Sequence, residues 1–292
     1  MAGLLDHLIC YAQPRRLTDV SAWHEHIPFA FYLVDLLRPG LIVELGTHKG
    51  DSYCAFCQAV SELQLDTRCC AVDSWAGDEH AGVYGPGVLD DLRRHHDILY
   101  ASFSTLIQST FDEALPRFAD ESIDLLHIDG LHTYEAVKHD FDSWLPKLSR
   151  KAVVLLHDIA VEGRGFGVRE FWNEIKQAYP SFEFSHGNGL GILGTGTDLP
   201  AEVARLLAQD GHHRQWFSSF FAALGNALTT RRALETAQAS LREEVSLVAQ
   251  LKRAVAENIS AAASQGDPGY QDWIQRHAFS EADRQRDARS GR

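Results

Sequence analysis

Short apolar runs alternate with helix-like segments from residue 41 to residue 194, and this alternation limits the fold more than any other feature of the chain. The main apolar runs are LIVELG (41–46), RCCAVD (68–73), SIDLLHID (122–129) and KAVVLLHD (151–158). Each run has the length of a buried parallel strand, and residues with helical periodicity separate them, as in 133–148. Strands that alternate with helices predict an α/β fold with a doubly wound sheet.

The pattern closes with FEFSH (182–186) and LGILG (190–194), which are typical of a hairpin-like pair. We therefore expect a mostly parallel sheet with an antiparallel last strand. Beyond residue 200 the composition changes, and residues 229–263 are rich in Ala, Glu, Gln, Leu and Arg. Apolar residues recur there every seven positions, at Leu234, Leu241, Val248 and Val255. Such spacing predicts a C-terminal helical extension or a short coiled coil, through which the chain can form a homo-oligomer.

These patterns predict four regions. Residues 1–40 form a helical lead-in, 41–198 the main domain, 199–263 the helical extension, and 264–292 a tail or linker. No run of 18 apolar residues is present, so no membrane span is expected. The N-terminus lacks the pattern of a secretory signal, which favours a cytoplasmic location.

The formal net charge of -13 disfavours nucleic acid as a partner, because an acidic surface repels phosphate backbones. Cys54 and Cys57 form a CxxC motif, but no second pair accompanies them. They are interpreted as buried thiols in a reducing compartment rather than as a zinc site.

Ligands of doubly wound folds bind at the carboxyl ends of the strands, so the end of the first strand is the place to look. It has the sequence Glu44-Leu-Gly46-Thr-His48-Lys-Gly50. A dinucleotide fingerprint that begins at Gly46 would need glycines where His48 and Asp51 stand, which argues against NAD or FAD. Gly46 and Gly50 permit a tight turn and a close backbone approach to a ligand.

Two acids complete this cofactor constellation. Glu44 lies two residues before the first glycine, where a carboxylate can accept hydrogen bonds from a cationic amino-acid group. Asp73 ends the second predicted strand, where an acid can accept hydrogen bonds from both hydroxyls of a ribose. We therefore expect a cofactor that has both a cationic amino-acid group and a ribose, bound by Glu44, Gly46, Gly50 and Asp73.

A second constellation follows two later strands, in Asp129-Gly-Leu-His132 and His157-Asp158. Carboxylate oxygens are ligands of hard divalent cations, so Asp129 and Asp158 can hold such an ion between neighbouring strands. His132 lies three residues after Asp129, at the entrance of a predicted helix. A neutral imidazole there can accept a proton from a metal-bound hydroxyl.

The E-x-G-x3-G segment and the acid of the second strand resemble motifs I and II of class I S-adenosylmethionine (SAM)-dependent methyltransferases. The stretch LLHIDGLHTYEAVKHDFDSWLPKLSRKAVVLLHD resembles bacterial enzymes that methylate sugars and small metabolites, including metal-dependent O-methyltransferases of macrolide sugars. The resemblance covers about residues 40–196 and implies a Rossmann-like methyltransferase sheet. It implies SAM as cofactor, Mg²⁺ at the metal site, and a glycan or small-molecule acceptor.

The same resemblance implies roles for individual residues. Asp129 and Asp158 match metal ligands, and His132 matches the catalytic base. His157 stands where the family has a further acidic ligand. Ser109 and Thr110 match the segment beside adenine. The irregular stretch 74–87 is a candidate lid that stacks on adenine or on a sugar ring.

Two other functions fit parts of the sequence. His127, Asp129 and His157 have the composition of the two-histidine, one-carboxylate triad of iron oxygenases. A non-catalytic, cofactor-binding scaffold whose helical tail is the working part is the other alternative. The tail segment Gly269-Tyr270-Gln-Asp272-Trp273-Ile274 resembles the lead-in to family-2 glycosyltransferase domains, which implies a modular enzyme that acts on a growing glycan.

Overall fold

The computed structural model describes residues 6–163, 165–264, 266, 268–273 and 276. Two compact units make up the chain, residues 1–230 and residues 231–292. The first unit contains the α/β domain and the second consists mainly of the outer part of a long helix. Each unit is considered by itself.

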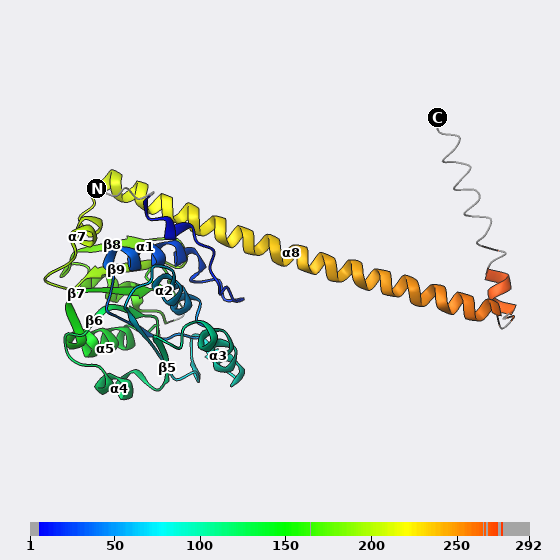
Figure 1. The fold of residues 1–292 in the computed structure, drawn as a ribbon, viewed down its shortest axis with the longest axis horizontal. Coiled ribbons are helices and arrows are strands. Elements are labelled where there is room, and N and C mark those ends of the chain that lie inside the picture. Colours follow the sequence, from blue (N-terminus) through cyan, green and yellow to red (C-terminus); the bar gives the residue numbers. More distant parts are fainter. Residues whose placement is uncertain (1–5, 164, 265, 267, 274–275, 277–292) are drawn as a thin grey trace. The chain divides into compact units, whose positions relative to one another are not determined.

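Seven strands form the main sheet of the first unit (Figure 1). Their order is β5-β2-β1-β6-β7-β9-β8, and β9 is the strand that runs opposite to the other six. The strands are β1 (Leu41–Leu45), β2 (Arg68–Asp73), β5 (Ser104–Gln108), β6 (Ile123–Ile128), β7 (Leu148–His157), β8 (Ser181–Phe184) and β9 (Leu190–Gly194). The predicted α/β class, the mostly parallel sheet and the antiparallel last strand are confirmed.

Helices cover both faces of this sheet, because alternate strand residues point to opposite sides and both sides are apolar. The helices are α1 (Ile27–Leu37), α2 (Asp51–Glu62), α3 (Gly87–Leu99), α4 (Phe111–Ala114), α5 (Tyr134–Trp144), α6 (Val168–Ile175) and α7 (Ala201–Leu207). One core lies under α1, α2, α3 and α7, and the other under α4, α5 and α6. Ile42 contributes to the first core, whereas Val43 and Leu45 contribute to the second.

Shorter elements connect these layers. The single-turn 3₁₀ helices are η2 (Leu8–Tyr11), η3 (His24–His26), η4 (Leu115–Arg117) and η5 (Leu145–Lys147). A small antiparallel hairpin, β3 (Gly77–Asp78) with β4 (Gly82–Val83), lies within the irregular stretch after β2.

The long helix α8 (Gly211–Ser264) belongs to both units. In the first unit Phe217, Phe221 and Leu228 are buried in the core under α1. In the second unit the heptad residues Leu234, Leu241, Val248 and Val255 are all exposed. No helix among the described residues combines the length and the hydropathy that crossing a membrane requires. In the tail, Gly269 to Trp273 are helical, and Ile274 lies outside the described residues.

The loop between β1 and α2 passes very close to the end of β6. Gly46 has a φ of +87°, and a Cβ there would lie 2.1 Å from the Asp129 carbonyl oxygen. Any side chain would therefore both strain the backbone and push the two strand ends apart. This close approach brings the loop against the carboxyl end of β6.

We expect Gly46→Ala to lower the free energy of unfolding by about 3 kcal/mol or more, because left-handed strain and a backbone clash combine. Gly82→Ala is the matched control, since Gly82 has a similar φ of +81° but no atom within 4 Å of its Cβ position. Its cost is expected to be only the left-handed strain of about 1–2 kcal/mol. Urea unfolding measures both, and equal losses would contradict the close packing at Gly46.

Candidate active site

The site lies at the carboxyl ends of β1, β2, β5, β6 and β7, where the strand order changes direction. Two adjoining cavities of about 220 Å³ and about 150 Å³ open there. They share six lining residues: Gly46, His48, Asp78, Tyr84, Asp129 and Gly130. The first cavity extends towards Asp73, Ser109 and Thr110, and the second towards His132, His157 and Asp158. The tertiary structure therefore brings the two predicted constellations to one place.

Asp73 is the residue that holds the loop after β1 in shape. Its Oδ2 atom accepts hydrogen bonds from the backbone N–H groups of Thr47 and His48, both at 2.8 Å. Its Oδ1 atom accepts a third from the N–H of Trp75, at 2.6 Å. Asp73 also lines the larger cavity of the site, and a carboxylate can accept more than these three hydrogen bonds.

His48 occupies a backbone conformation that favours glycine. Its φ is +48°, in the left-handed region, although it carries a full side chain. The indole Nε1 of Trp75 donates a hydrogen bond to the His48 carbonyl, and the Tyr84 ring stacks on the imidazole at 4.4 Å between centroids. These contacts offset the strain of a left-handed backbone at a residue with a side chain.

Glu44 does not line either cavity. Its side chain is fully buried on the sheet face covered by α1 and α2, and its Oε2 atom lies 2.8 Å from Nδ1 of His127. Trp23 donates from Nε1 to Nε2 of His127, so His127 carries its proton on Nδ1 and donates it to Glu44. Burial raises the pKa of Glu44, and the bond from His127 counteracts part of that shift. The sequence predicted that Glu44 contacts the cofactor. In the structure, Glu44 belongs to a buried series of hydrogen bonds with His127 and Trp23, beneath the loop that follows β1.

Ser109 and Thr110 follow β5 and line the first cavity. Thr110 is also the N-cap of α4, since its hydroxyl accepts from the Glu113 N–H at 3.3 Å and Glu113 completes a capping box. The positive end of this short helix thus faces the cavity beside Phe111.

Asp129, His132 and Asp158 form the compact polar cluster of the site. One ligand-type atom from each lies within 4.8 Å of the others. His132 Nε2 is 2.9 Å from Asp158 Oδ2 and 3.4 Å from Asp129 Oδ1. Thr133 caps α5 through its own side chain, so the His132 imidazole is not needed as a cap.

The electrostatics of this cluster follow from its mixed charges. Burial by itself disfavours a charged imidazole, but hydrogen bonds to Asp129 and Asp158 outweigh it and raise the pKa of His132 to about 10. The pKa of His157 rises to about 9, against the effect of its burial, through the charge of Asp129 and a hydrogen bond to it. Burial acts to raise the pKa of Asp129, but these two histidines hold it well below its usual range.

His157 is the last residue of β7 and is almost fully buried. Its Nδ1 lies 3.2 Å from Asp129 Oδ1, and its Nε2 donates to the Gly187 carbonyl at 3.2 Å. With both nitrogens engaged, His157 lies behind the acids, and the cluster of potential ligands comprises Asp129, His132 and Asp158 instead.

This cluster fits a divalent cation. Asp158 Oδ1 is buried and accepts no hydrogen bond among the described residues, although it lies 3.4 Å from Nδ1 of His157, so it keeps lone pairs for a ligand. Two carboxylates and one imidazole are donors for Mg²⁺ or Mn²⁺. A cation there would compete for the oxygens that hold the His132 proton.

Phe166 was not identified from the sequence. Its ring stacks on His132 at 4.7 Å with an interplanar angle of 12°, and the His80 ring lies 4.5 Å from Phe166 and 5.7 Å from His132, so the three rings form a triangle. His80 lies between the two strands of the β3–β4 hairpin, so the predicted lid contacts the Asp129–His132–Asp158 cluster through these rings. The sequence feature that could have indicated Phe166 is its position between two glycines, Gly165 and Gly167.

Residues 43–159 match a family model described as a methyltransferase domain. The matched segment contains both constellations and five of the seven sheet strands. Residues 43–159 are therefore similar to a methyltransferase domain, in agreement with the family resemblance of the sequence motifs.

A curated relative, an uncharacterized protein of Sinorhizobium fredii, is 42% identical over 282 residues. The alignment covers 88% of this chain but only 31% of the relative's length. Similar solved structures include the O-methyltransferase TomG of Streptomyces achromogenes in complex with SAM, at 16% identity and a TM-score of 0.44 over 62% of this chain and 92% of that one. A Podospora anserina methyltransferase has 12% identity and a TM-score of 0.46 over 63% and 91% of the two chains.

We expect His127→Leu to lower the free energy of unfolding by about 3–5 kcal/mol at neutral pH, because it leaves the Glu44 carboxylate buried without its partner. Replacing both residues by leucine removes the buried charge as well and should cost less than this single change. Urea unfolding of the variants tests this, and a double variant less stable than His127→Leu would contradict it.

The loss in His127→Leu should also depend on pH. Burial raises the pKa of Glu44 above its unfolded value, so the folded chain holds a proton that the unfolded chain releases. Stability then falls as pH rises above the ordinary titration range of a carboxyl group. The deficit of His127→Leu relative to the wild type should grow with pH, because the variant lacks the bond from His127 that lowers the pKa of Glu44.

Proposed function

We propose that the chain is a SAM-dependent O-methyltransferase that methylates a sugar hydroxyl on a glycan or small metabolite. The observation that carries this proposal is the Asp129–His132–Asp158 cluster at the wall of a cavity whose other end is lined by the cofactor loop. A methyl donor in the cavity and an acceptor hydroxyl at the cluster would meet in the space they share.

In the proposed reaction, His132 acts as its neutral imidazole, because a divalent cation held by Asp129 and Asp158 would occupy the carboxylates that stabilise its proton. Its Nε2 atom then takes the proton of the acceptor hydroxyl. The hydroxyl oxygen bonds to the donated methyl carbon as the carbon–sulfur bond breaks and its electron pair stays on sulfur. A divalent cation at Asp129 and Asp158 would supply positive charge that favours the deprotonated oxygen. Phe166, stacked on His132, holds the imidazole plane and keeps water from that face.

We assign cofactor binding to Asp73, Gly46, Gly50, Ser109 and Thr110. Asp73 accepts hydrogen bonds from the ribose hydroxyls, and the two glycines allow the backbone to approach the cofactor closely. Glu44 acts indirectly, because its buried hydrogen bonds with His127, and through it with Trp23, support the loop that follows β1.

Asp73→Ala is expected to weaken binding of SAM and of its demethylated product by about ten- to a hundredfold, the effect of a lost charged hydrogen bond. Glu44→Gln keeps the shape of a side chain that lies outside both cavities, so its effect should be smaller. Calorimetry measures both affinities. An unchanged affinity in Asp73→Ala would refute the placement, and a larger effect of Glu44→Gln would restore Glu44 as a direct anchor.

His132→Ala is expected to lower methyl transfer by about 10²–10⁴-fold, the range typical of a lost general base, with little change in SAM affinity. His139→Ala is the matched control, since that imidazole is exposed on α5. The assay is a methyl-transfer screen against nucleotide sugars, glycans and small phenols. Asp129→Ala and Asp158→Ala should each abolish any dependence of activity on Mg²⁺, and chelator treatment of the wild type should lower its activity. Full activity after chelation would exclude the metal role but not the base.

The alternative functions fare differently. The iron-oxygenase triad needs His127, but both nitrogens of that ring are engaged by Trp23 and Glu44. The sheet is also α/β rather than an antiparallel barrel. A non-catalytic scaffold would bind SAM without turning it over, and the screen decides that case.

We further propose that the acceptor is a glycan and that the chain is part of a modular enzyme. Its support is that the Sinorhizobium fredii relative is much longer than the part aligned with this chain. The exposed heptad residues of α8 suit a spacer or a dimerising helix. The net charge of -13 continues to disfavour nucleic acid.

A further inference from the structure

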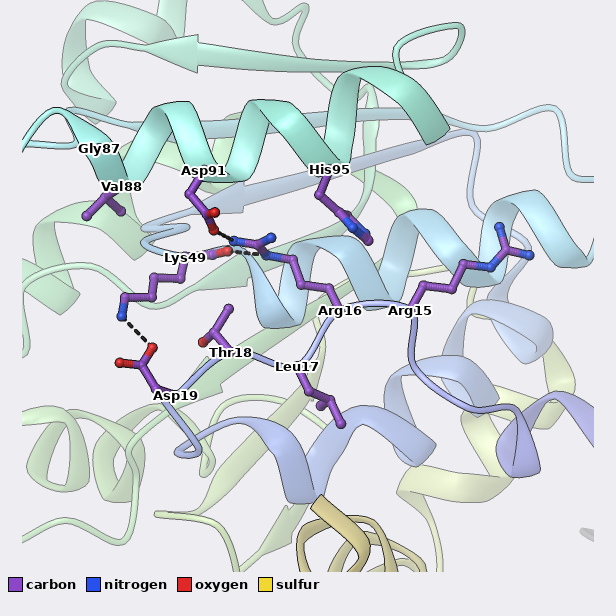
Figure 2. Close-up of a pocket in the computed structure, with 10 residues that line it drawn as sticks. All are labelled: Arg15, Arg16, Leu17, Thr18, Asp19, Lys49, Gly87, Val88, Asp91 and His95. Atoms are coloured by element: carbon purple, nitrogen blue, oxygen red, sulfur yellow. Dashed lines mark hydrogen bonds and ion pairs between the residues drawn. The ribbon is translucent and has the colours of Figure 1, made fainter. Parts of the chain in front are cut away.

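A cavity of about 520 Å³, larger than either cavity of the active site, lies on the other side of the cofactor loop. Figure 2 shows its walls: the N-terminal segment with Arg16 and Asp19, the loop residue Lys49, and helix α3 with Asp91 and His95. Lys49 also lines the active-site cavity, so this loop separates the two spaces.

Arg16 is the fixed positive charge of this cavity. Its side chain is only 9% exposed, and its Nε donates to the Lys49 carbonyl at 2.6 Å. One Nη2 hydrogen bond runs to Asp91, at 2.8 Å. A guanidinium has five N–H groups, so the backbone and Asp91 orient Arg16 while further donors stay available to a ligand.

The carboxylates beside these cations project into solvent. Asp19, the partner of Lys49, is 80% exposed, and Asp91 is 53% exposed. Lys49 and Asp19 form the more exposed of the two pairs, and exposed ion pairs contribute little, so an anion of higher charge can displace Asp19 at small cost. Arg16 keeps its bond to Asp91 and offers its remaining N–H groups, so two cations are available in a chain whose net charge is -13.

The start of α3 adds neutral donors. Its N-cap, Pro86, provides no side-chain hydrogen bond to the first turn. Gly87 and Val88 line the cavity, and the Val88 N–H already donates to the Gly85 carbonyl at 3.1 Å, so Gly87 supplies the nearest backbone donor. Exposed N–H groups and the helix dipole at such an end favour anions. On the next turns His95 Nε2 is buried and has no partner among the described residues. Burial, and next the charge of Arg16, lower the pKa of His95, which supports a positive potential there.

We propose that this cavity binds a small molecule bearing a phosphate or diphosphate group, held by Arg16, Lys49 and the N-terminus of α3. Its volume lies within the range of about 300–1,000 Å³ that small-molecule sites occupy, so it admits more than a bare phosphate. A nucleoside diphosphate fits the size and the charge. This site does not depend on the methyl-transfer reaction, because none of its residues belongs to the Asp129 cluster.

The test is calorimetry on the full chain, at low salt and without divalent cations, with inorganic phosphate, pyrophosphate and uridine diphosphate as separate probes. Saturable binding of pyrophosphate is expected. Tighter binding of uridine diphosphate supports a nucleotide ligand, and equal binding supports a site for the diphosphate alone. Absence of saturable binding for all three overturns the proposal.

Gly87→Glu and Gly87→Gln locate the site. A Cβ at Gly87 meets no atom within 4 Å, and an acid in the first turn of a helix is favourable, so both variants should fold. The glutamate should weaken pyrophosphate binding by about tenfold or more through like-charge repulsion, whereas the isosteric glutamine should retain most of the affinity. Equal affinities of these two variants would overturn the assignment.

Lys49→Gln gives an independent check with a different control. It should weaken pyrophosphate binding by about tenfold, while Lys138→Gln, which removes a partly exposed charge from α5, should leave it unchanged. An equal effect of both changes would show that the chain's overall charge, not this cavity, governs binding.

Discussion

The close packing of Gly46 against the Asp129 carbonyl is the contact on which the site depends. Where a Cβ would lie 2.1 Å from that oxygen, the bare glycine lets the end of β1 rest on the end of β6. The loop after β1 therefore begins beside the end of β6, where Asp129 and His132 of the polar cluster lie. A larger residue at position 46 would move the ends of β1 and β6 apart by the thickness of a side chain.

Charge within the site is balanced by alternation of acids and histidines. Asp129 lies between His132 and His157, and Asp158 contacts both histidines from the next strand. Each carboxylate favours the protonated imidazole, and each imidazole favours the ionised carboxylate. The cluster is thus stable as an ion-pair network by itself, and a divalent cation would enter it by replacing a proton on His132.

The N-terminal segment supports the site without lying on the sheet. Arg16 bonds to the carbonyl of Lys49, Thr18 bonds to Asp51 at the start of α2, and Trp23 bonds to His127. These contacts fix the cofactor loop from the side opposite to β6. They also make that loop the shared wall of two cavities of different charge, so occupation of one can affect the geometry of the other.

The local sequence pattern was sufficient to predict the strands and most of the polar residues at their carboxyl ends. The spacing of LIVELG, RCCAVD, SIDLLHID and KAVVLLHD defined an α/β sheet, and a parallel sheet must bring Asp73, Asp129 and Asp158 to one edge. Period-two alternation alone places Glu44 on the opposite face from Val43 and Leu45.

What the sequence could not determine is what covers each face. Glu44 and His127 form a buried pair only because α1, α2 and Trp23 exclude water from their side of the sheet. His157 turns from a candidate ligand into a residue behind the acids because the Gly187 carbonyl, thirty positions later in the chain, takes its second nitrogen. Phe166 and Arg16 come to the site through loops that carry no periodic signal. Spacing determines which residues lie at a strand end, whereas the contacts between distant segments determine which of their atoms remain available to a ligand.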